Sequence, residues 1–259
     1  AGQGSCRRDK PASPPMKLLV DAGNTRLKWL LVGDGHLVGT GSAILDADDP
    51  FCDIRCQSAH IRRVAVSTVI SEERRQHLQM QLEAFCRAPI VFHWAEPHRG
   101  GLVNAYTETD RMGADRWHAM YAAWQADKGG FAVVDAGSAI TIDYVADSGA
   151  HLGGYILPGK QMMLRSLRQD AARIGFDASD VQAAEPGAST TECVQHGLVW
   201  LWASMAARIE ADCRRLGLGR VLVTGGDAEG LLDAGLSAHH EPFLVLKGLA
   251  AVDGESERE

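Results

Sequence analysis

Hydrophobic and polar residues follow a repeating order in the first half of the chain. Short apolar runs separated by polar turns indicate strands, and a later segment with apolar residues at helical spacing indicates an amphipathic helix. Ser71 is placed to cap a helix whose first turn is rich in glutamate. The predicted elements of this half are strands over 17–22, 27–32, 37–45, 64–70 and 90–94, and helices over 71–86 and 114–126.

The pattern starts again at Phe131, which suggests an internal duplication. Each half opens with a strand that ends in Asp-Ala-Gly followed by Asn or Ser. The predicted elements of the second half are strands over 131–137, 139–145 and 151–159, helices over 160–173 and 191–216, a strand, Gly-rich turn and helix over 220–230, and a closing segment over 242–250. We therefore expect two α/β domains, 16–127 and 128–259, after a disordered tail over 1–15.

Composition excludes several classes of function. The chain has 259 residues and a net charge of -7, with no dense Lys/Arg run, so we expect no nucleic-acid partner. No window reaches the ~20 apolar residues that span a bilayer, so we expect no membrane partner either. The first residues lack the apolar core of a secretory signal, and Met16 is interpreted as the functional start.

The six cysteines are scattered, which fits free thiols in a reducing cytoplasm. Cys52, Cys56 and His60 offer three metal ligands, yet they lack the closely paired cysteines of a zinc knuckle. A loop or short helix is the preferred interpretation, and a metal site is the alternative.

The turn after the first strand, "DAGNTRLK" over residues 21–28, has the chemistry of a phosphate-binding hairpin. Glycine lets a phosphate approach the backbone closely, and backbone N–H groups, amides and hydroxyls donate to phosphoryl oxygens. The Asp suits Mg²⁺ or its water shell, since direct contact with a phosphate would be repulsive. A lone copy is common turn chemistry. The second copy, "DAGSAITID" over 135–143, and a late "VTGGDA" over 223–228 strengthen the phosphate interpretation.

These three loops together resemble the phosphate and adenosine loops of the actin-like ATPase and sugar-kinase superfamily. Within it, the chain resembles the type III pantothenate kinases from about residue 17 to 250. The motifs that carry the resemblance are "DAGNTRLKW", "NAYTETDRMGADRW", "DAGSAITID", "GGYILPG", "TTECVQHG", "VTGGDA" and "LVLKGL". The resemblance implies two duplicated actin-like (ribonuclease H-like) α/β halves, each a mixed sheet flanked by helices, with a nucleotide cleft between them.

The family phosphorylates the primary hydroxyl of pantothenate with ATP, the first step of coenzyme A synthesis. The resemblance implies Mg²⁺ and a monovalent cation, K⁺ or NH₄⁺, as cofactors. Asp115 matches the family's general base, although a helix-start Asp also offsets the helix dipole without any catalytic role. The residues implied to bind ATP are Asp21, Ala22, Gly23, Asn24, Thr25, Arg26, Leu27, Lys28, Ser138, Gly225 and Gly226.

By resemblance, Asp135 holds the monovalent cation and Asp21 holds magnesium, directly or through water. Arg116 suits a bidentate grip on the pantothenate carboxylate, and Asp143 is left as either a structural carboxylate or one that acts behind the substrate contacts. Thr190 matches a substrate-contacting threonine, yet by itself it has the character of a helix cap, as does Thr191. The residues implied to bind the substrate are Tyr106, Gly113, Ala114, Asp115, Arg116 and Thr190.

Two substitutions depart from the family pattern. Thr109 stands where a proline is common, which makes that loop less rigid, and Ser138 replaces a threonine but keeps its hydroxyl. The apolar helix over 194–207, with Trp200 and Trp202, is consistent with the homodimer that the family forms. The alternatives are a kinase for another small hydroxyl compound on the same fold, and a non-catalytic accessory regulator of transcription.

Overall fold

The computed structural model describes residues 15–171, 174–177 and 183–258, in two compact units. The first unit extends to Val66 and resumes over Ile70–Phe92. The second contains Ser67–Val69 and the chain from His93 onward. The disorder predicted for the tail falls, apart from Pro15, outside the described residues.

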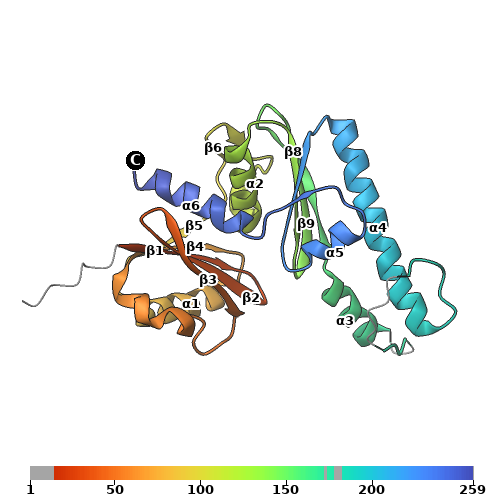
Figure 1. The fold of residues 1–259 in the computed structure, drawn as a ribbon, viewed down its shortest axis with the longest axis horizontal. Coiled ribbons are helices and arrows are strands. Elements are labelled where there is room, and N and C mark those ends of the chain that lie inside the picture. Colours follow the sequence, from red (N-terminus) through yellow and green to blue (C-terminus); the bar gives the residue numbers. More distant parts are fainter. Residues whose placement is uncertain (1–14, 172–173, 178–182, 259) are drawn as a thin grey trace, which may run out of the picture. The chain divides into compact units, whose positions relative to one another are not determined.

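The first unit is built on a five-stranded sheet with the order β3-β2-β1-β4-β5 (Figure 1). The hairpin of β1 and β2 sets Asp21 opposite Lys28, so the predicted phosphate turn lies at one end of an antiparallel pair. The elements are β1 (Met16–Ala22), β2 (Arg26–Gly33), β3 (His36–Ile44), η1 (Cys52–His60), β4 (Ile61–Thr68), α1 (Glu72–Phe85) and β5 (Ile90–His93).

Alternate residues of β1 face the core of this unit, as a period of two requires. Leu18 and Val20 are fully buried there and pack in one cluster with Leu78 and Leu82 of α1. Ser71 caps α1 as predicted, because its Oγ accepts from Arg74 N at 3.4 Å.

The second unit repeats this strand order in its own sheet, β10-β9-β8-β11-β12. β8 pairs antiparallel with β9 and parallel with β11, so the sheet is mixed. The equivalent order in both sheets confirms the predicted fold class and fits the predicted duplication. The strands are β8 (Phe131–Ala136), β9 (Ala139–Val145), β10 (His151–Pro158), β11 (Arg220–Thr224) and β12 (His239–His240), with a separate ribbon of β6 (His98–Arg99) and β7 (Leu102–Val103).

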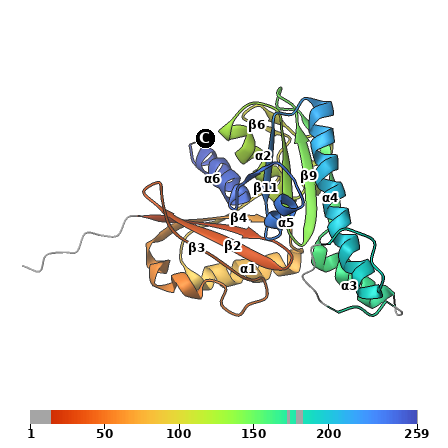
Figure 2. The ribbon, with the colours of Figure 1, turned by 45° about the vertical axis from the view of Figure 1, so that its right-hand side comes forward.

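Helices cover both faces of the second sheet (Figure 2). Ala132 and Val134 of β8 pack in one cluster with residues of α4, whereas Phe131 and Val133 pack in another with residues of α2 and α6. The helices of this unit are η2 (Thr109–Arg111), α2 (Ala114–Ala126), α3 (Lys160–Asp170), α4 (Thr190–Leu216), α5 (Ala228–Asp233) and α6 (Leu244–Ser256).

The compact units divide the chain at a different place from the predicted boundary after residue 127. Helix α2 belongs to the second unit, because its Trp117 and Tyr121 share a core with Phe131 of β8 and Leu244 of α6. The predicted helix end at Arg173 lies outside the described residues.

The Cys52–His60 segment is a short 3₁₀ helix, as the preferred interpretation held. Within the described parts of the chain, no group of three or more His, Cys, Asp or Glu side chains is arranged to hold a metal ion. The described helices also include none with the length and apolar character needed to cross a membrane.

Candidate active site

The turn after β1 is an open, exposed loop in the first unit. Gly23 N donates to Arg26 O at 2.9 Å and closes the turn, while Asn24 and Thr25 are exposed. A methyl group on Gly23 would approach only Arg26 O, at 3.3 Å. The side chains of Asn24 and Thr25 therefore face solvent, while the Thr25 carbonyl accepts from Leu45 N at 3.0 Å; exposed amide and hydroxyl groups suit a loop that receives a phosphate.

Two arginines of the first unit form hydrogen bonds at the turn over residues 21–28. Arg74 of α1 donates from Nη1 to Asn24 O at 2.9 Å and pairs through Nη2 with Asp46 at 2.6 Å. Arg26 donates to Ser42 Oγ at 2.9 Å. Lys28, opposite Asp21 in the strand register, adds a further positive charge near the carboxylate. The loop thus combines exposed donors with local positive charge.

In the matching turn after β8, Ser138 is exposed, but two glycine segments pack closely against the turn's backbone, and we call it the enclosed turn for that reason. Gly159 N donates to Ser138 O at 3.0 Å, and Asp227 N donates to Ala136 O at 2.8 Å. A Cβ on Gly159 would lie 2.4 Å from Gly137 O, so no larger residue fits there. Two other segments of the second unit therefore hydrogen-bond to this turn and fix its backbone.

Gly225 and Gly226 have different surroundings at the end of β11. Gly225 has φ +96°, and a Cβ there would lie 2.3 Å from Ala136 O and 2.6 Å from Asp135 Oδ1. Gly226 would meet nothing within 4 Å. Gly225 is required by backbone conformation and close approach, whereas Gly226 leaves bare backbone exposed to a ligand.

Gly225 packs closely against a carboxylate oxygen of Asp135 and against the carbonyl oxygen of Ala136, which also accepts from Asp227 N. Such oxygens are the ligands that alkali and alkaline-earth cations prefer. The donor set at Asp135 therefore fits the monovalent cation that the sequence resemblance implies.

Asp115 lies in the first turn of α2, after a glycine that leaves room for it. Gly113 precedes the helix, and a Cβ at Gly113 would lie 2.6 Å from Asp115 Oδ1. The same oxygen accepts from Arg116 N at 2.7 Å. The helix start thus fixes the carboxylate with one oxygen bonded to backbone.

Burial raises the pKa of Asp115 above its usual range, although the N–H and guanidinium of Arg116 act in the opposite direction. The nearby negative charge of Asp143 raises it further. A carboxylate with a raised pKa is a stronger base than an exposed one, which suits acceptance of a proton from a hydroxyl.

Arg116 is committed to a partner within the protein. Its Nε and Nη2 donate to the two oxygens of Asp143 at 2.9 and 2.6 Å, and its Nη1 donates to the Tyr106 hydroxyl at 3.0 Å. The Arg116 guanidinium, which was predicted to bind the substrate carboxylate, therefore binds the Asp143 carboxylate in this structure. Asp143, whose role the sequence left open, is a buried carboxylate that orients Arg116.

His151 completes this network and was not identified from the sequence. It is buried at the start of β10, and its Nε2 lies 2.9 Å from Asp143 Oδ1. Burial would raise the pKa of Asp143, but hydrogen bonds from His151 and Arg116 outweigh it and lower that pKa. The sequence did contain one signal for such a partner: Asp143 lies within the apolar run of β9, and a buried charge requires partners.

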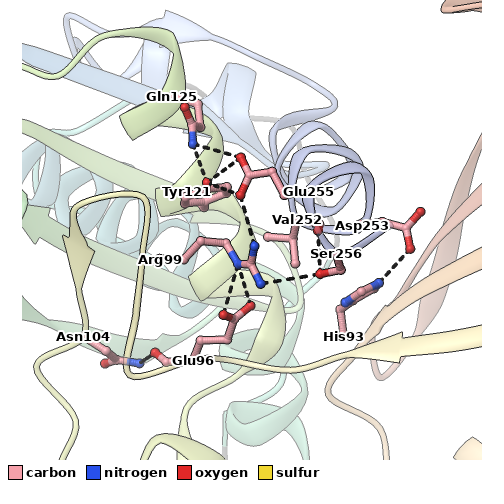
Figure 3. Close-up of polar contacts among 10 residues, drawn as sticks. All are labelled: His93, Glu96, Arg99, Asn104, Tyr121, Gln125, Val252, Asp253, Glu255 and Ser256. Carbon is pink, nitrogen blue, oxygen red and sulfur yellow. Dashed lines mark hydrogen bonds and ion pairs between the residues drawn. The ribbon is translucent and has the colours of Figure 1, made fainter. Parts of the chain in front are cut away.

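Helix α6 holds α2 in position by close packing and hydrogen bonds (Figure 3). The Tyr121 hydroxyl of α2 donates to Glu255 at 2.7 Å, and Arg99 also pairs with Glu255 at 3.1 Å. A Cβ on Gly248 would lie 1.7 Å from His118 O of α2, so the two helices touch through backbone. His93 and Asp253, 2.8 Å apart, add a link to α6.

Thr190 is the first residue of α4 and is exposed, but it does not cap the helix. Ser189 is the cap, since its Oγ accepts from Glu192 N at 3.2 Å. Thr191 instead accepts from Asp177 N at 3.2 Å. The interpretation of Thr190 as a cap was wrong by one residue, because three consecutive hydroxyl residues compete for one position.

The structure therefore brings together two groups of predicted residues in the second unit. Arg116 and Tyr106 are hydrogen-bonded next to Asp115, and Gly225 packs against the turn that carries Asp135. The Asp21 turn belongs to the first unit and is described by itself.

Comparison with known proteins identifies related sequences along almost the whole chain. The model of the type III pantothenate kinase family matches residues 17–212. A type III pantothenate kinase of Marinobacter nauticus is 50% identical over 92% of this chain and 98% of its own length. One from Hahella chejuensis is 35% identical over 91% of this chain and 96% of its own length.

Solved structures with low sequence identity share the fold. A proposed Baf family transcriptional activator from Campylobacter jejuni superposes with a TM-score of 0.60 at 21% identity, covering 93% of this chain and all of that one. The activator of 2-hydroxyisocaproyl-CoA dehydratase from Clostridium difficile, solved with ADPNP, gives 0.52 at 12% identity, covering 94% of this chain and 96% of that one. Because the family model matches most of the chain and the M. nauticus protein is half identical to it, the chain belongs to the type III pantothenate kinase family.

Proposed function

We propose that the protein transfers the γ-phosphoryl group of ATP to the primary hydroxyl of pantothenate, giving 4'-phosphopantothenate and ADP in the first step of coenzyme A synthesis. The observation that carries the proposal is Asp115, a partly buried carboxylate of raised pKa at the start of α2, within a chain of this family. The names of the related kinases support the same substrate.

In the proposed reaction, the pantothenate hydroxyl oxygen forms a bond to the γ-phosphorus as the bond from that phosphorus to the β,γ-bridging oxygen breaks. The Asp115 carboxylate accepts the hydroxyl proton, and ADP leaves with the electron pair of the broken bond. One Asp115 oxygen is bonded to Arg116 N, so the other oxygen is the proposed proton acceptor. Phosphoryl transfer depends mainly on positioning and charge neutralisation, so the base is one contribution among several.

The phosphates of ATP are assigned to the open turn over residues 21–28, with Asn24 and Thr25 as donors and Lys28 as a positive charge. Asp21 is the proposed magnesium-side carboxylate. Since Mg²⁺ keeps several waters and binds through one or two carboxylates plus phosphates, a single Asp at this turn fits it. When bound, Mg²⁺ supplies neutralisation of the phosphate charge.

The enclosed turn over residues 135–138 is assigned to the remaining ligands of the nucleotide. Asp135 would hold K⁺ or NH₄⁺, with the oxygens around Gly225 as the supporting observation, and Ser138 and the bare backbone of Gly226 would contact ATP. When bound, the monovalent cation offsets repulsion between phosphates. Tyr106, Gly113, Ala114 and Thr190 remain the proposed substrate contacts, whereas Arg116 is bonded to Asp143 and to the Tyr106 hydroxyl.

The proposal includes a homodimer in the cytoplasm. Exposed apolar side chains lie on β10 and α4 of the second unit, with Tyr155 50%, Ile156 63% and Trp200 62% exposed, and a second copy of the chain would bury them. The five cysteines that the structure describes are free thiols, which a reducing compartment maintains. Light scattering of Trp200→Glu against wild type tests the interface: a dimeric wild type and a monomeric variant are expected, whereas a dimeric variant contradicts it.

A coupled ADP-release assay tests the substrate. Pantothenate, pantothenate analogues and simple sugars are each supplied with ATP and Mg²⁺, with K⁺ present or replaced by Na⁺. We expect ADP release to require pantothenate and to be faster with K⁺. Preferential turnover of another hydroxyl compound would favour a different kinase on the same fold, and Thr109, partly buried in η2, is where such a change in specificity would arise.

A further inference from the structure

His151, Asp143, Arg116 and Tyr106 form one continuous hydrogen-bonded chain in the second unit. The distances along it are 2.9 Å from His151 Nε2 to Asp143, 2.6 and 2.9 Å from Asp143 to Arg116, and 3.0 Å from Arg116 Nη1 to the Tyr106 hydroxyl. The side chains of His151 and Asp143 are 0% and 1% exposed, so neither reaches a substrate directly.

The backbone fixes the hydrogen position on His151. Ala105 N donates to His151 Nδ1 at 3.3 Å, so Nδ1 is the acceptor and the ring hydrogen lies on Nε2. That hydrogen points to Asp143 Oδ1. The imidazole therefore accepts at Nδ1 and donates from Nε2 to the carboxylate, so that it is held from both sides.

The strands are shaped to make this contact. The register of β10 on β9 shifts between His151 and Gly153, so one extra residue brings His151 opposite Val145. A bulge of this kind re-aims a side chain near a functional site. A Cβ on Gly154 would lie 2.5 Å from Asp143 Oδ1, so the glycine keeps room for the carboxylate.

Tyr106 is the last residue of this hydrogen-bonded series, and its side chain is only partly buried. Its hydroxyl accepts from cationic Arg116, which directs the tyrosine's own O–H hydrogen toward another acceptor. The Tyr106 ring is flanked by the His151 ring, 6.4 Å away between centroids and 13° from parallel, and by the Arg116 guanidinium at 5.6 Å from its centroid. Its position is thus determined by the same residues that orient its hydroxyl.

We propose that His151 and Asp143 are positioning residues for substrate recognition: they lock Arg116, and Arg116 orients the Tyr106 hydroxyl to donate to an acceptor oxygen of pantothenate. Because the charges of Arg116 and Asp143 compensate each other, these residues do not offer the substrate a free cation. They offer it the oriented Tyr106 hydroxyl as a hydrogen-bond donor. This inference rests on the proposed function, since it names how that same substrate is held.

The test is a double-mutant cycle with His151→Phe and Tyr106→Phe. His151→Phe keeps a flat ring beside Tyr106 but removes the N–H donor, and His151→Gln restores an N–H at similar reach. His239→Phe, at an exposed histidine of β12, is the matched control. For each variant, KM for pantothenate, KM for ATP and kcat are measured, and circular dichroism confirms the fold.

If the four residues act together in this way, His151→Phe and Tyr106→Phe should each raise KM for pantothenate about tenfold, because each removes one good hydrogen bond. KM for ATP should not change. The double variant should be no worse than Tyr106→Phe alone, and His151→Gln should recover most of the affinity. Additive effects, or a His151→Phe variant that loses only kcat and thermal stability, overturn the inference. If the wild-type protein does not phosphorylate pantothenate, the proposed function itself is overturned, and so is pantothenate as the ligand of Tyr106.

Discussion

The two Asp-Ala-Gly turns occupy equivalent places in two sheets of the same strand order, yet they are built differently. After β1, Gly23, Asn24 and Thr25 form an exposed turn that another segment contacts through Arg74. After β8, only Gly137 and Ser138 separate the strands, and Gly159 and Gly225 press against their backbone. Shared topology therefore preserved the position of the turn, whereas the residues around it determine what each copy can bind.

On this difference we base the separate tasks proposed for the two turns. The open turn has room for a phosphate and offers donors and positive charge. The enclosed turn presents fixed oxygens at Asp135 and Ala136, which suit a cation. The second unit adds a helix start that carries the proposed general base, Asp115.

The largest expected effect is at Asp115, which neither turn can replace. Asp115→Asn should lower kcat by about 10²–10⁴-fold, the usual contribution of a general base. The variant is measured by ADP release with saturating pantothenate. Asp110→Asn, at an exposed carboxylate of η2 nearby, is the matched control and should keep the wild-type rate. A full rate in Asp115→Asn would remove the base from the account.

The raised pKa of Asp115 also predicts its pH dependence. The folded state holds this proton more tightly than the unfolded chain, so the contribution to stability is present at low pH and is lost as pH rises through the folded-state pKa. Asp115→Asn should therefore unfold at an equal or higher temperature than wild type at pH 7. In wild type, kcat/KM should rise with pH through a pKa above the ordinary Asp value of about 3.9. A lower melting temperature for the variant would contradict this reading.

Gly225→Ala should damage the enclosed turn far more than Gly226→Ala. At Gly225 the positive φ and the oxygens of Ala136 and Asp135 predict a loss of about 1–3 kcal/mol of stability and weaker ATP binding. Gly226 has open space, so its variant should keep the melting temperature. If Gly226→Ala nevertheless raises KM for ATP, the nucleotide lies on that backbone. Equal losses of stability at both positions would break the contrast.

Asp135→Asn should abolish the stimulation by K⁺ while leaving the requirement for Mg²⁺ intact. Removing the negative charge weakens cation binding at the enclosed turn, and Asn keeps the shape of the side chain. The rate is measured with increasing K⁺ at constant ionic strength. Asp21→Asn is the matched variant in the open turn and should change the Mg²⁺ dependence instead. If Asp135→Asn changed the Mg²⁺ dependence and Asp21→Asn abolished the stimulation by K⁺, the two proposed cation sites would have to be exchanged.

The smallest effect is expected at the open turn. Asn24→Ala should raise KM for ATP by about tenfold at most, since one hydrogen bond is removed. Its melting temperature should not change, because the side chain is exposed and it is the Asn24 carbonyl that Arg74 contacts. Thermal unfolding and KM for ATP are measured together, and a large drop in melting temperature would show that this turn is structural.

Local features were predictable from the sequence to a useful degree. The hairpins, the duplication, the Ser71 cap and the helix that carries Asp115 all depend on neighbouring residues, and the structure contains them. The positions of the turns could be predicted from their glycines because turn formation depends on neighbouring residues.

Long-range pairing was not predictable in the same way. Arg116 and Asp143 are 27 residues apart, and no spacing rule connects them or selects His151 from ten histidines. The placement of α2 in the second unit also depends on packing against α6, more than a hundred residues later. Such contacts follow from the assembled fold, so the sequence suggested a free Arg116 where the structure has an ion pair.

The most direct test of the central claim is to follow the phosphoryl group itself. Wild-type protein is incubated with ATP, Mg²⁺, K⁺ and pantothenate, and the products are identified by ³¹P NMR and mass spectrometry. We predict equal amounts of ADP and of a phosphomonoester on the primary hydroxyl of pantothenate. Release of inorganic phosphate with unmodified pantothenate, or no reaction, would contradict it.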